Sequence, residues 1–203
     1  MNRVEHLTRG TVEHAPPPCR DCMWWQTRPG AAAPDRDRWT RQAEDDFGPW
    51  GKLYMDEGRV AGLIQYGPAD QFARARTLPA GPPDRDAALI TCAYLTEATS
   101  PWILQSLFLS AIGECKDRGF PALEAFGYRY PSDESFDVRF LGHRTIFPSD
   151  FLRDFGFRAR RSAGRVELAR LDLRGLVPVE DASLVEKIKE RLAVVNPAPA
   201  APA

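Results

Sequence analysis

The sequence lacks a long apolar run: no stretch approaches the roughly 20 consecutive apolar residues that a membrane-spanning helix needs. Its first residues carry charges and no apolar segment, so they do not resemble a secretory signal. We therefore expect a soluble, cytoplasmic protein that has no membrane partner.

An excess of charge of either sign is also missing. The formal net charge is −1, from 27 basic and 28 acidic residues, so nothing in the composition points to a nucleic-acid partner. Hydrophobic residues make up 43% of the chain, which is enough for a packed core and argues against general disorder.

Cysteine is scarce, with four in the chain, and without a secretory signal we expect free thiols. Two of them form Cys19-x-x-Cys22 in the stretch "CRDCMWWQ". The pair supplies only half of a tetrahedral zinc site, and no second close pair exists, so no metal is expected. We interpret the motif as a tight turn that anchors Trp24 and Trp25 in the core or at a binding cleft. Zinc binding and a redox role are the alternatives.

Turn residues divide the first half of the chain into short elements. Residues 1–18 end in three prolines and are predicted to form an extended arm. A helix is expected over 35–47, closed by Gly48-Pro49. The segment "GKLYMDEGRVAGLIQYGP" predicts a hairpin that turns at Asp56-Glu57-Gly58. A loop over 67–86, rich in arginine and proline, follows it.

The second half alternates strands and helices. The apolar run 87–95, "AALITCAYL", predicts a strand buried on both faces. Ser100 suits the N-cap of a long helix, and Pro101 suits its first position. Further strands are expected at "PALEAFGY" and "RVELARLDL", with one or two short helices between them that end at Gly156. The predicted divisions are an arm (1–18), a domain (19–175), a C-terminal helix (176–195) and a disordered Ala/Pro tail (196–203).

This order of elements resembles the GCN5-related N-acetyltransferase (GNAT) superfamily, and most of all its actinobacterial members. The matching stretches include "KLYMDEGRVAGLIQYGP", "LITCAYL", "SPWILQSLFLSAIGECKDRG" and the closing "FLRDFGF". The resemblance implies an α/β (α+β) fold: one domain with a mixed, mostly antiparallel sheet of about six to seven strands flanked by helices.

The resemblance also implies acetyl-CoA, or another acyl-CoA, as cofactor. In this family a strand diverges from its neighbour and exposes backbone amides to the thioester, and the next helix receives the pyrophosphate at its N-terminus. The positions that correspond to these contacts here are Cys92, Ala93, Tyr94, Leu95, Thr99, Ser100, Trp102 and Ile103.

The expected pyrophosphate loop is degenerate. Family members carry (Gln/Arg)-x-x-Gly-x-(Gly/Ala), whereas this chain has "TSPWIL" over residues 99–104. Trp102 and Leu104 replace the two small residues that let a phosphate approach the backbone. Pro101 lacks one N–H donor of the cradle. Binding of CoA is therefore open at this point.

The residues suited to acyl-transfer chemistry are few. Glu97 is the first candidate for the general base, with a solvated loop carboxylate as the alternative. Glu124 is the second, unless it simply pairs with an arginine. Tyr128 is the candidate acid, or a packing residue. The family often has a tyrosine acid in the following helix. The aromatic residues of this chain there are Phe147, Phe151 and Phe155, which cannot donate a proton. His143 titrates near neutral pH but is more often structural as a lone histidine.

Two functions fit these patterns. The first is an acetyl-CoA-dependent N-acyltransferase that acts on an unidentified amine. Arg74, Arg76 and Arg85 would then favour an anionic acceptor, or serve as solvated loop charges. The second is a non-catalytic binding or regulatory protein with the same fold. The helix predicted at 179–193 packs on its own domain or on a second copy, which would give a homodimer.

Overall fold

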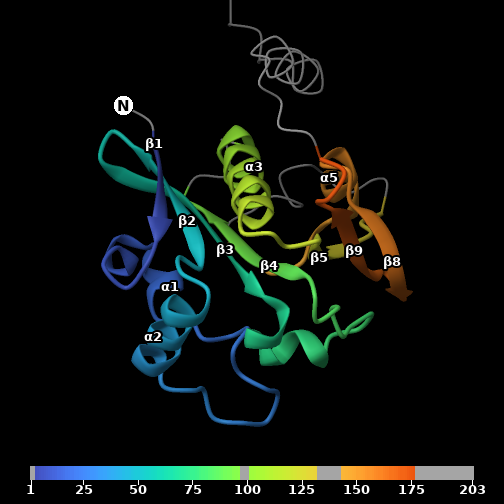
Figure 1. Ribbon diagram of the computed structural model, residues 1–203, viewed down its shortest axis with the longest axis horizontal. Coiled ribbons are helices and arrows are strands. Elements are labelled where there is room, and N and C mark those ends of the chain that lie inside the picture. The colour runs from blue at the N-terminus through green and yellow to red at the C-terminus, as the bar shows by residue number, and fades with distance from the viewer. Residues whose placement is uncertain (1–2, 97–100, 132–142, 177–203) are drawn as a thin grey trace, which may run out of the picture.

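The computed structural model describes residues 3–96, 101–131 and 143–176, and within them one twisted sheet crosses the molecule (Figure 1). The order of its main path is β1-β2-β3-β4-β5-β9-β8, with β6 also paired to β4 and β7 to β5. Pairing is antiparallel except between β4 and β5 and between β5 and β7. The strands are β1 (Arg3–Leu7), β2 (Gly51–Asp56), β3 (Arg59–Pro68), β4 (Ala88–Leu95), β5 (Ala122–Tyr128), β6 (His143–Arg144), β7 (Phe147–Pro148), β8 (Arg158–Ala163) and β9 (Val166–Asp172).

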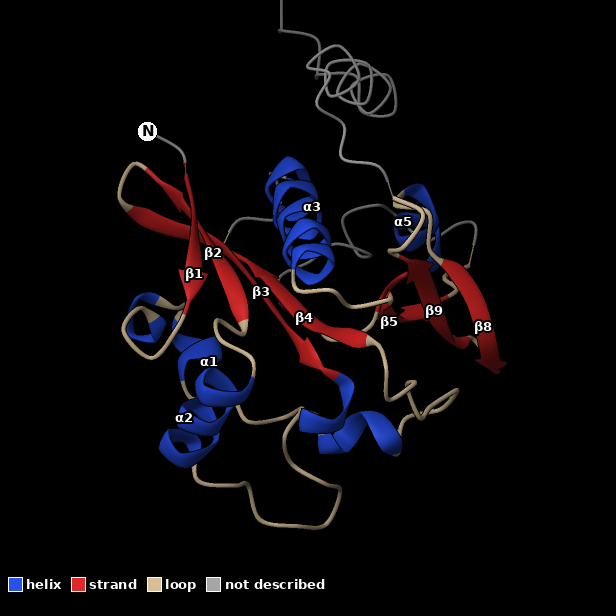
Figure 2. Ribbon diagram, viewed as in Figure 1, coloured by secondary structure: helices blue, strands red, loops and turns tan. Residues whose placement is uncertain are grey.

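Helices cover both faces of the sheet. Helices α3 and α5 lie on one face, and α1 and α2 lie on the other (Figure 2). None of the helices in the described ranges is long and apolar enough to cross a membrane. The helices are α1 (Pro17–Arg20), α2 (Arg36–Asp46), α3 (Pro101–Asp117) and α5 (Ser149–Asp154), with 3-10 turns at Val12–His14, Ala69–Gln71 and Ala73–Arg76.

Local sequence explains why the first elements begin and end where they do. Asp35 caps α2, because its carboxylate accepts a hydrogen bond of 2.6 Å from the Arg38 amide. The β2–β3 turn holds Glu57 and Gly58, both at positive φ (47° and 82°), as a tight two-residue hairpin turn requires. The predicted hairpin and the helix over 35–47 are confirmed.

Helix α3 packs very closely on β3. A Cβ placed on Gly62 would lie 2.9 Å from Cγ2 of Ile103 and 3.1 Å from Cδ1 of Leu107, so only glycine fits there. The same face of the sheet carries an aromatic cluster around Phe108, whose ring meets Phe147 and Phe151 edge-on with centroids 4.9 Å apart. This is the main hydrophobic core.

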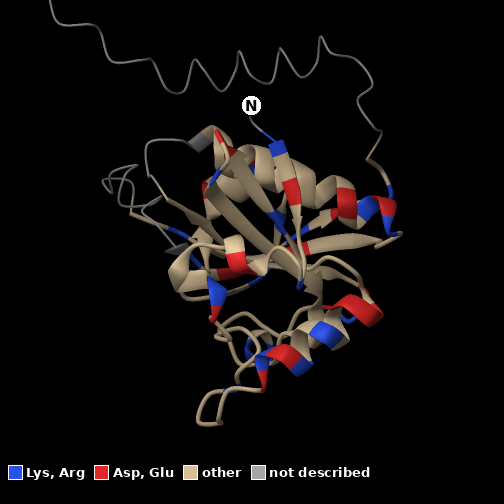
Figure 3. Ribbon diagram, turned by 90° about the vertical axis from the view of Figure 1, so that its left-hand side faces the viewer, with Lys and Arg blue, Asp and Glu red and all other residues tan. Residues whose placement is uncertain are grey.

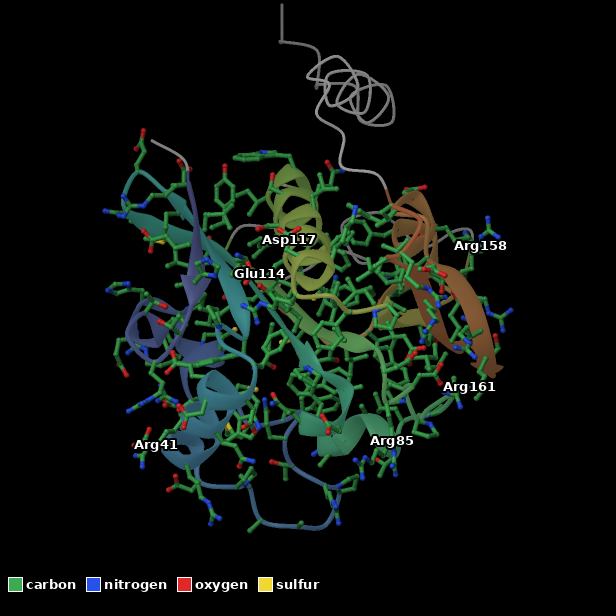
Figure 4. The ribbon with its side chains drawn as sticks, viewed as in Figure 1. Arg41, Arg85, Glu114, Asp117, Arg158 and Arg161 are labelled. Atoms are coloured by element: carbon green, nitrogen blue, oxygen red, sulfur yellow. The ribbon has the colours of Figure 1, made fainter. Side chains whose placement is uncertain are left out.

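Buried charges fasten the other end of α3 to the sheet. The Lys52 ammonium, 7% exposed, donates hydrogen bonds to Glu114 of α3 and, at 3.1 Å, to Nδ1 of His6. Arg118 also donates to Glu114, and it bonds the carbonyl of Phe47 at 2.7 Å. Figure 4 labels Glu114 on the helix, above the sheet. Lys52, Glu114 and Arg118 each have a hydrogen-bonding partner of opposite charge, so the cluster fixes the position of α3 on the sheet.

Most predicted elements are confirmed, and three segments differ. Residues 3–7, in the predicted arm, form β1 as an edge strand of the sheet. Residues 158–163 form β8, for which no strand was predicted. The stretch 143–148 holds the short strands β6 and β7, and helix α5 follows them. The predicted helix at 179–193 and the tail lie outside the described residues.

Candidate active site

Strands β4 and β5 run together for only part of their length. Their parallel pairing joins Ala88–Ile90 to Leu123–Ala125 and stops there. The register between β3 and β4 shifts just beyond, between Gln65 and Tyr66, so β4 has one extra residue, Thr91, next to Cys92. Past this point β4 and β5 diverge and leave a wedge between them.

Two short strands occupy that wedge. Ala93 and Tyr94 of β4 pair with Arg144 and His143 of β6, while Gly127 and Tyr128 of β5 pair with β7. Ala93 and Tyr94 also pair with β3 on their other side. Cys92 pairs with Gln65 of β3 and, among the described residues, has no strand partner on the side facing the wedge.

A pocket opens next to Cys92, on the sheet face that carries α1 and α2. It contains about 530 Å³ of empty space with its mouth included, of which about 40 Å³ is room that water-sized groups can reach. Strand residues Gln65 and Cys92 lie at its base, and Trp25, Trp39 and Trp50 contribute to its walls. Its remaining lining residues are Leu7, Val12, Ala15, Cys19, Arg20, Cys22, Met23, Gln26, Arg36, Thr40 and Leu63.

The pocket lining contains buried polar atoms that lack hydrogen-bond partners. Within the described ranges, seven buried side-chain polar atoms are unpaired, and four of them belong to pocket residues. These four are Nε of Arg20, Nε1 of Trp25 and both amide atoms of Gln26. Gln26 is 6% exposed and Trp25 is 2% exposed, so water is largely excluded from their polar atoms. Such a concentration in one pocket marks it as a candidate ligand site.

Comparison with solved structures gives the architecture its context. An N-acetyltransferase from Staphylococcus aureus Mu50 superposes with a TM-score of 0.50 at 13% identity, covering 85% of this chain and 99% of that one. The chain has the GNAT fold. The PaiA N-acetyltransferase from Thermoplasma acidophilum in complex with coenzyme A reaches 0.49 at 16% identity, covering 85% and 99%. A GCN5-related N-acetyltransferase from Kribbella flavida reaches 0.48 at 14% identity, covering 84% and 97%. No family model matches the sequence, and no curated protein does.

The resemblance seen in the sequence led us to expect a thioester beside the end of β4, and the described residues agree with that expectation only in part. Among the positions expected to contact the cofactor, Cys92 has no strand partner on the wedge side within the described residues. Ala93 and Tyr94 pair with β6 on this side of β4. Leu95 is a core residue, 3% exposed.

The start of α3 is described only from Pro101 onward, so Thr99, Ser100 and Glu97 lie outside the described residues. Trp102 does not enter the wedge. Its indole is 44% exposed and meets Tyr54 of β2 edge-on, with centroids 5.2 Å apart. The side chain of Ile103 is 4% exposed and packs in the core.

Glu124 has the structural role that the sequence left as its alternative. Its carboxylate is fully buried, accepts a hydrogen bond of 2.8 Å from the Asp84 amide and pairs with Arg170 at 3.2 Å. Burial raises the pKa of Glu124 above its ordinary value, against these two hydrogen bonds, which lower it. Glu124 is thus enclosed by its partners and does not line the pocket beside Cys92.

Tyr128 lies at the end of β5, half-buried, and its ring meets Tyr130 edge-on at 4.9 Å. This contact fits the packing role that the sequence left open for it. His143 pairs with Tyr94 through β6, beside the wedge.

The cysteine motif reaches the pocket through Cys19 and Cys22, and Cys92 joins them from β4. Burial, followed by the neighbouring Cys22, raises the pKa of Cys19 to about 12, and burial also raises the pKa of Cys92. The thiols of Cys19 and Cys92 are therefore neutral at physiological pH and act as small apolar groups. No cluster of His, Cys, Asp and Glu side chains in the described ranges is arranged to hold a metal ion.

The loop arginines lie elsewhere. Arg76 and Arg85 border a separate, open pocket with Arg161 and two aspartates, Asp70 and Asp84. Figure 4 labels Arg85 and Arg161 in that region, well away from Glu114 on α3. Arg74 instead stacks 4.3 Å from the ring centre of Trp24. Charged residues of both signs are interspersed over the ribbon (Figure 3).

Sequence reasoning missed the polar members of the pocket: Arg20, Gln26 and Gln65. Arg20 and Gln26 lie within the quoted "CRDCMWWQ" stretch, so their spacing around two tryptophans was the signal available. The expectation that these tryptophans anchor at the core or at a cleft holds for Trp25, which does both.

Proposed function

We propose that this protein is an acyl-CoA-dependent N-acyltransferase whose amine acceptor enters the pocket between α1, α2 and the sheet. One observation carries the proposal: Cys92 belongs to both parts of the site. Its backbone lies where β4 and β5 diverge, and its side chain forms part of the pocket base. A thioester held at the wedge and an amine held in the pocket would then meet at this residue.

Acyl transfer from a thioester to an amine requires few groups from the protein. A bound acyl-CoA supplies a thioester carbonyl, at which a new C–N bond replaces the C–S bond. The amine loses one proton, and the departing thiolate gains one. The pocket residues orient the amine and exclude water from it, which is the main contribution of a positioning site. Glu97, which follows β4 by two residues in the sequence, remains the candidate for accepting the proton.

The alternative is a binding protein with the GNAT fold and no catalysis. The occupation of the wedge by β6 favours it, because a paired strand competes with a thioester for the same edge of β4. In this reading the pocket still takes a ligand, but no acyl group is transferred.

Calorimetric titration with acetyl-CoA and with CoA separates the two. The acyltransferase predicts binding with a Kd below about 100 μM, or about −5.5 kcal/mol. A Trp102→Ala variant should bind at least as tightly, because this indole lies against Tyr54 and not in the wedge. Absence of heat at about 1 mM CoA in both proteins would overturn the proposed function and leave the binding protein.

A further inference from the structure

The unpaired atoms of the pocket define the group that would satisfy them. Arg20 Nε, Trp25 Nε1 and Gln26 Nε2 are donors, whereas Gln26 Oε1 is an acceptor. A matching ligand therefore offers mainly acceptor atoms and at least one N–H donor. Since the amide of Gln26 presents its donor and acceptor side by side, the ligand must present an acceptor and a donor side by side as well.

The charged residues of the pocket lining narrow the choice of ligand. The pocket lining contains two arginines and no acidic residue. Arg36 is already neutralised, at 2.7 Å by Asp21 and at 3.7 Å by Glu13. Arg20 has only one weak hydrogen bond, of 3.5 Å to the Ala15 carbonyl, and no carboxylate partner within the described residues. A guanidinium in this position is best satisfied by a carboxylate.

The size of the pocket agrees with a carboxylate as the polar end of the ligand. One water needs about 10–15 Å³ of such room, so 40 Å³ accepts about three heavy atoms. A carboxylate has three. The pocket as a whole, about 530 Å³ with its opening included, is also lined by Trp39, Trp50 and Leu63, which suit an apolar body. The head of the ligand is thus polar and its body apolar.

We propose that the pocket binds the free α-amino and α-carboxylate groups of an amino acid with an apolar side chain. The carboxylate accepts from Arg20, Trp25 and Gln26, and the amine donates to Oε1 of Gln26. The inference rests on the proposed function only for what happens next, namely acylation of this amine. Binding itself requires no cofactor.

The test uses the pocket tryptophans as reporters. Fluorescence of the full-length protein, excited selectively at tryptophan, is followed during titration with L-phenylalanine, phenylacetate and phenethylamine, with CoA absent. L-Phenylalanine should give a saturable change, and the two probes that lack either the amine or the carboxylate should bind at least about tenfold more weakly.

Variants tie the signal to the named atoms. Arg20→Met should weaken L-phenylalanine and phenylacetate at least about tenfold and leave phenethylamine unchanged. Gln26→Leu should abolish L-phenylalanine binding without lowering the melting temperature, because it removes two unpaired buried polar atoms. A purely structural glutamine would lose stability on this change. Gln71→Leu is the matched control, since Gln71 also has an unpaired buried oxygen but does not line the pocket.

Several outcomes would overturn the inference. They are the lack of a saturable change at about 10 mM probe, equal affinity for all three probes, and equal loss in the Gln71 variant. Calorimetry with CoA keeps the two proposals apart. L-Phenylalanine binding without CoA binding refutes the acyltransferase alone, whereas CoA binding without L-phenylalanine binding refutes the amino-acid site alone.

Discussion

The two faces of the sheet treat their buried polar groups differently. On the α3 face, the hydroxyls of Tyr66 and Ser149 are unpaired, but the charged groups Lys52, Glu114 and Arg118 satisfy one another beside a tightly packed aromatic core. On the α2 face, Arg20 and Gln26 surround open space with atoms that no described residue satisfies. Both faces pack against the same strands, so the difference is in the side chains and not in the fold.

This difference separates residues that stabilise the fold from residues that are available to bind a ligand. A paired buried charge fixes the position of a helix, and removing one partner leaves the other uncompensated. An unpaired buried group costs stability in the empty protein, and a ligand that pairs with it removes that cost. Substitutions on the α3 face should therefore change stability, and those on the α2 face should change binding.

The largest effect is expected for Phe108→Ala on the α3 face. Its ring is fully buried against Phe147 and Phe151, so its removal should lower the free energy of unfolding by about 3–5 kcal/mol in denaturant titration. L-Phenylalanine should still bind the folded protein, because the pocket lies across the sheet.

Leu109→Ala is the control for this prediction. Leu109 is the next residue of α3 but is 52% exposed, so its stability should stay within about 0.5 kcal/mol of the wild type. Equal losses in the two variants would contradict the assignment of the core to this face.

A smaller effect is expected for Glu114→Gln. Burial opposes ionisation, but the hydrogen bond from Lys52 and the charge of Arg118 hold the pKa of Glu114 below its ordinary value of 4.5. Its stabilisation is therefore fully present above about pH 4.5 and is lost as the pH falls through the lower, folded-state value. At pH 7 the variant should lose about 1–3 kcal/mol, measured by denaturant titration.

The pH dependence tests the sign of this shift. The difference between wild type and Glu114→Gln should shrink as the pH is lowered from 5 toward 3, and a difference that grows instead would refute it. Asp172→Asn is the control: Asp172 pairs with Arg174 at 2.8 Å, but both are exposed, so stability should hardly change.

The sequence predicted the parts of the fold whose local signals agree with their environment. Glu57-Gly58 specified the hairpin, and the apolar run of β4 with Pro101 after it specified a strand followed by a helix. Strand β8 escaped prediction because every residue of "RARRSA" is exposed, so no apolar alternation marks it. Strands β6 and β7 have two residues each, too few to show a period.

The site was less predictable because it depends on contacts between distant segments. Its base comes from Gln65 and Cys92, and its polar wall comes from Arg20 and Gln26. No spacing rule brings these segments together. Glu124 shows the converse: its position in the chain suggested chemistry, but its partner Arg170 on β9 gives it a structural role.

Release of free CoA thiol tests the central claim most directly. Wild-type protein is mixed with acetyl-CoA, with and without L-phenylalanine, and thiol is measured over time beside the Arg20→Met variant. The account predicts thiol release that requires L-phenylalanine, yields N-acetylphenylalanine in equal amount, and falls at least about tenfold in the variant. Thiol release that is independent of L-phenylalanine, or equal in both proteins, would contradict it.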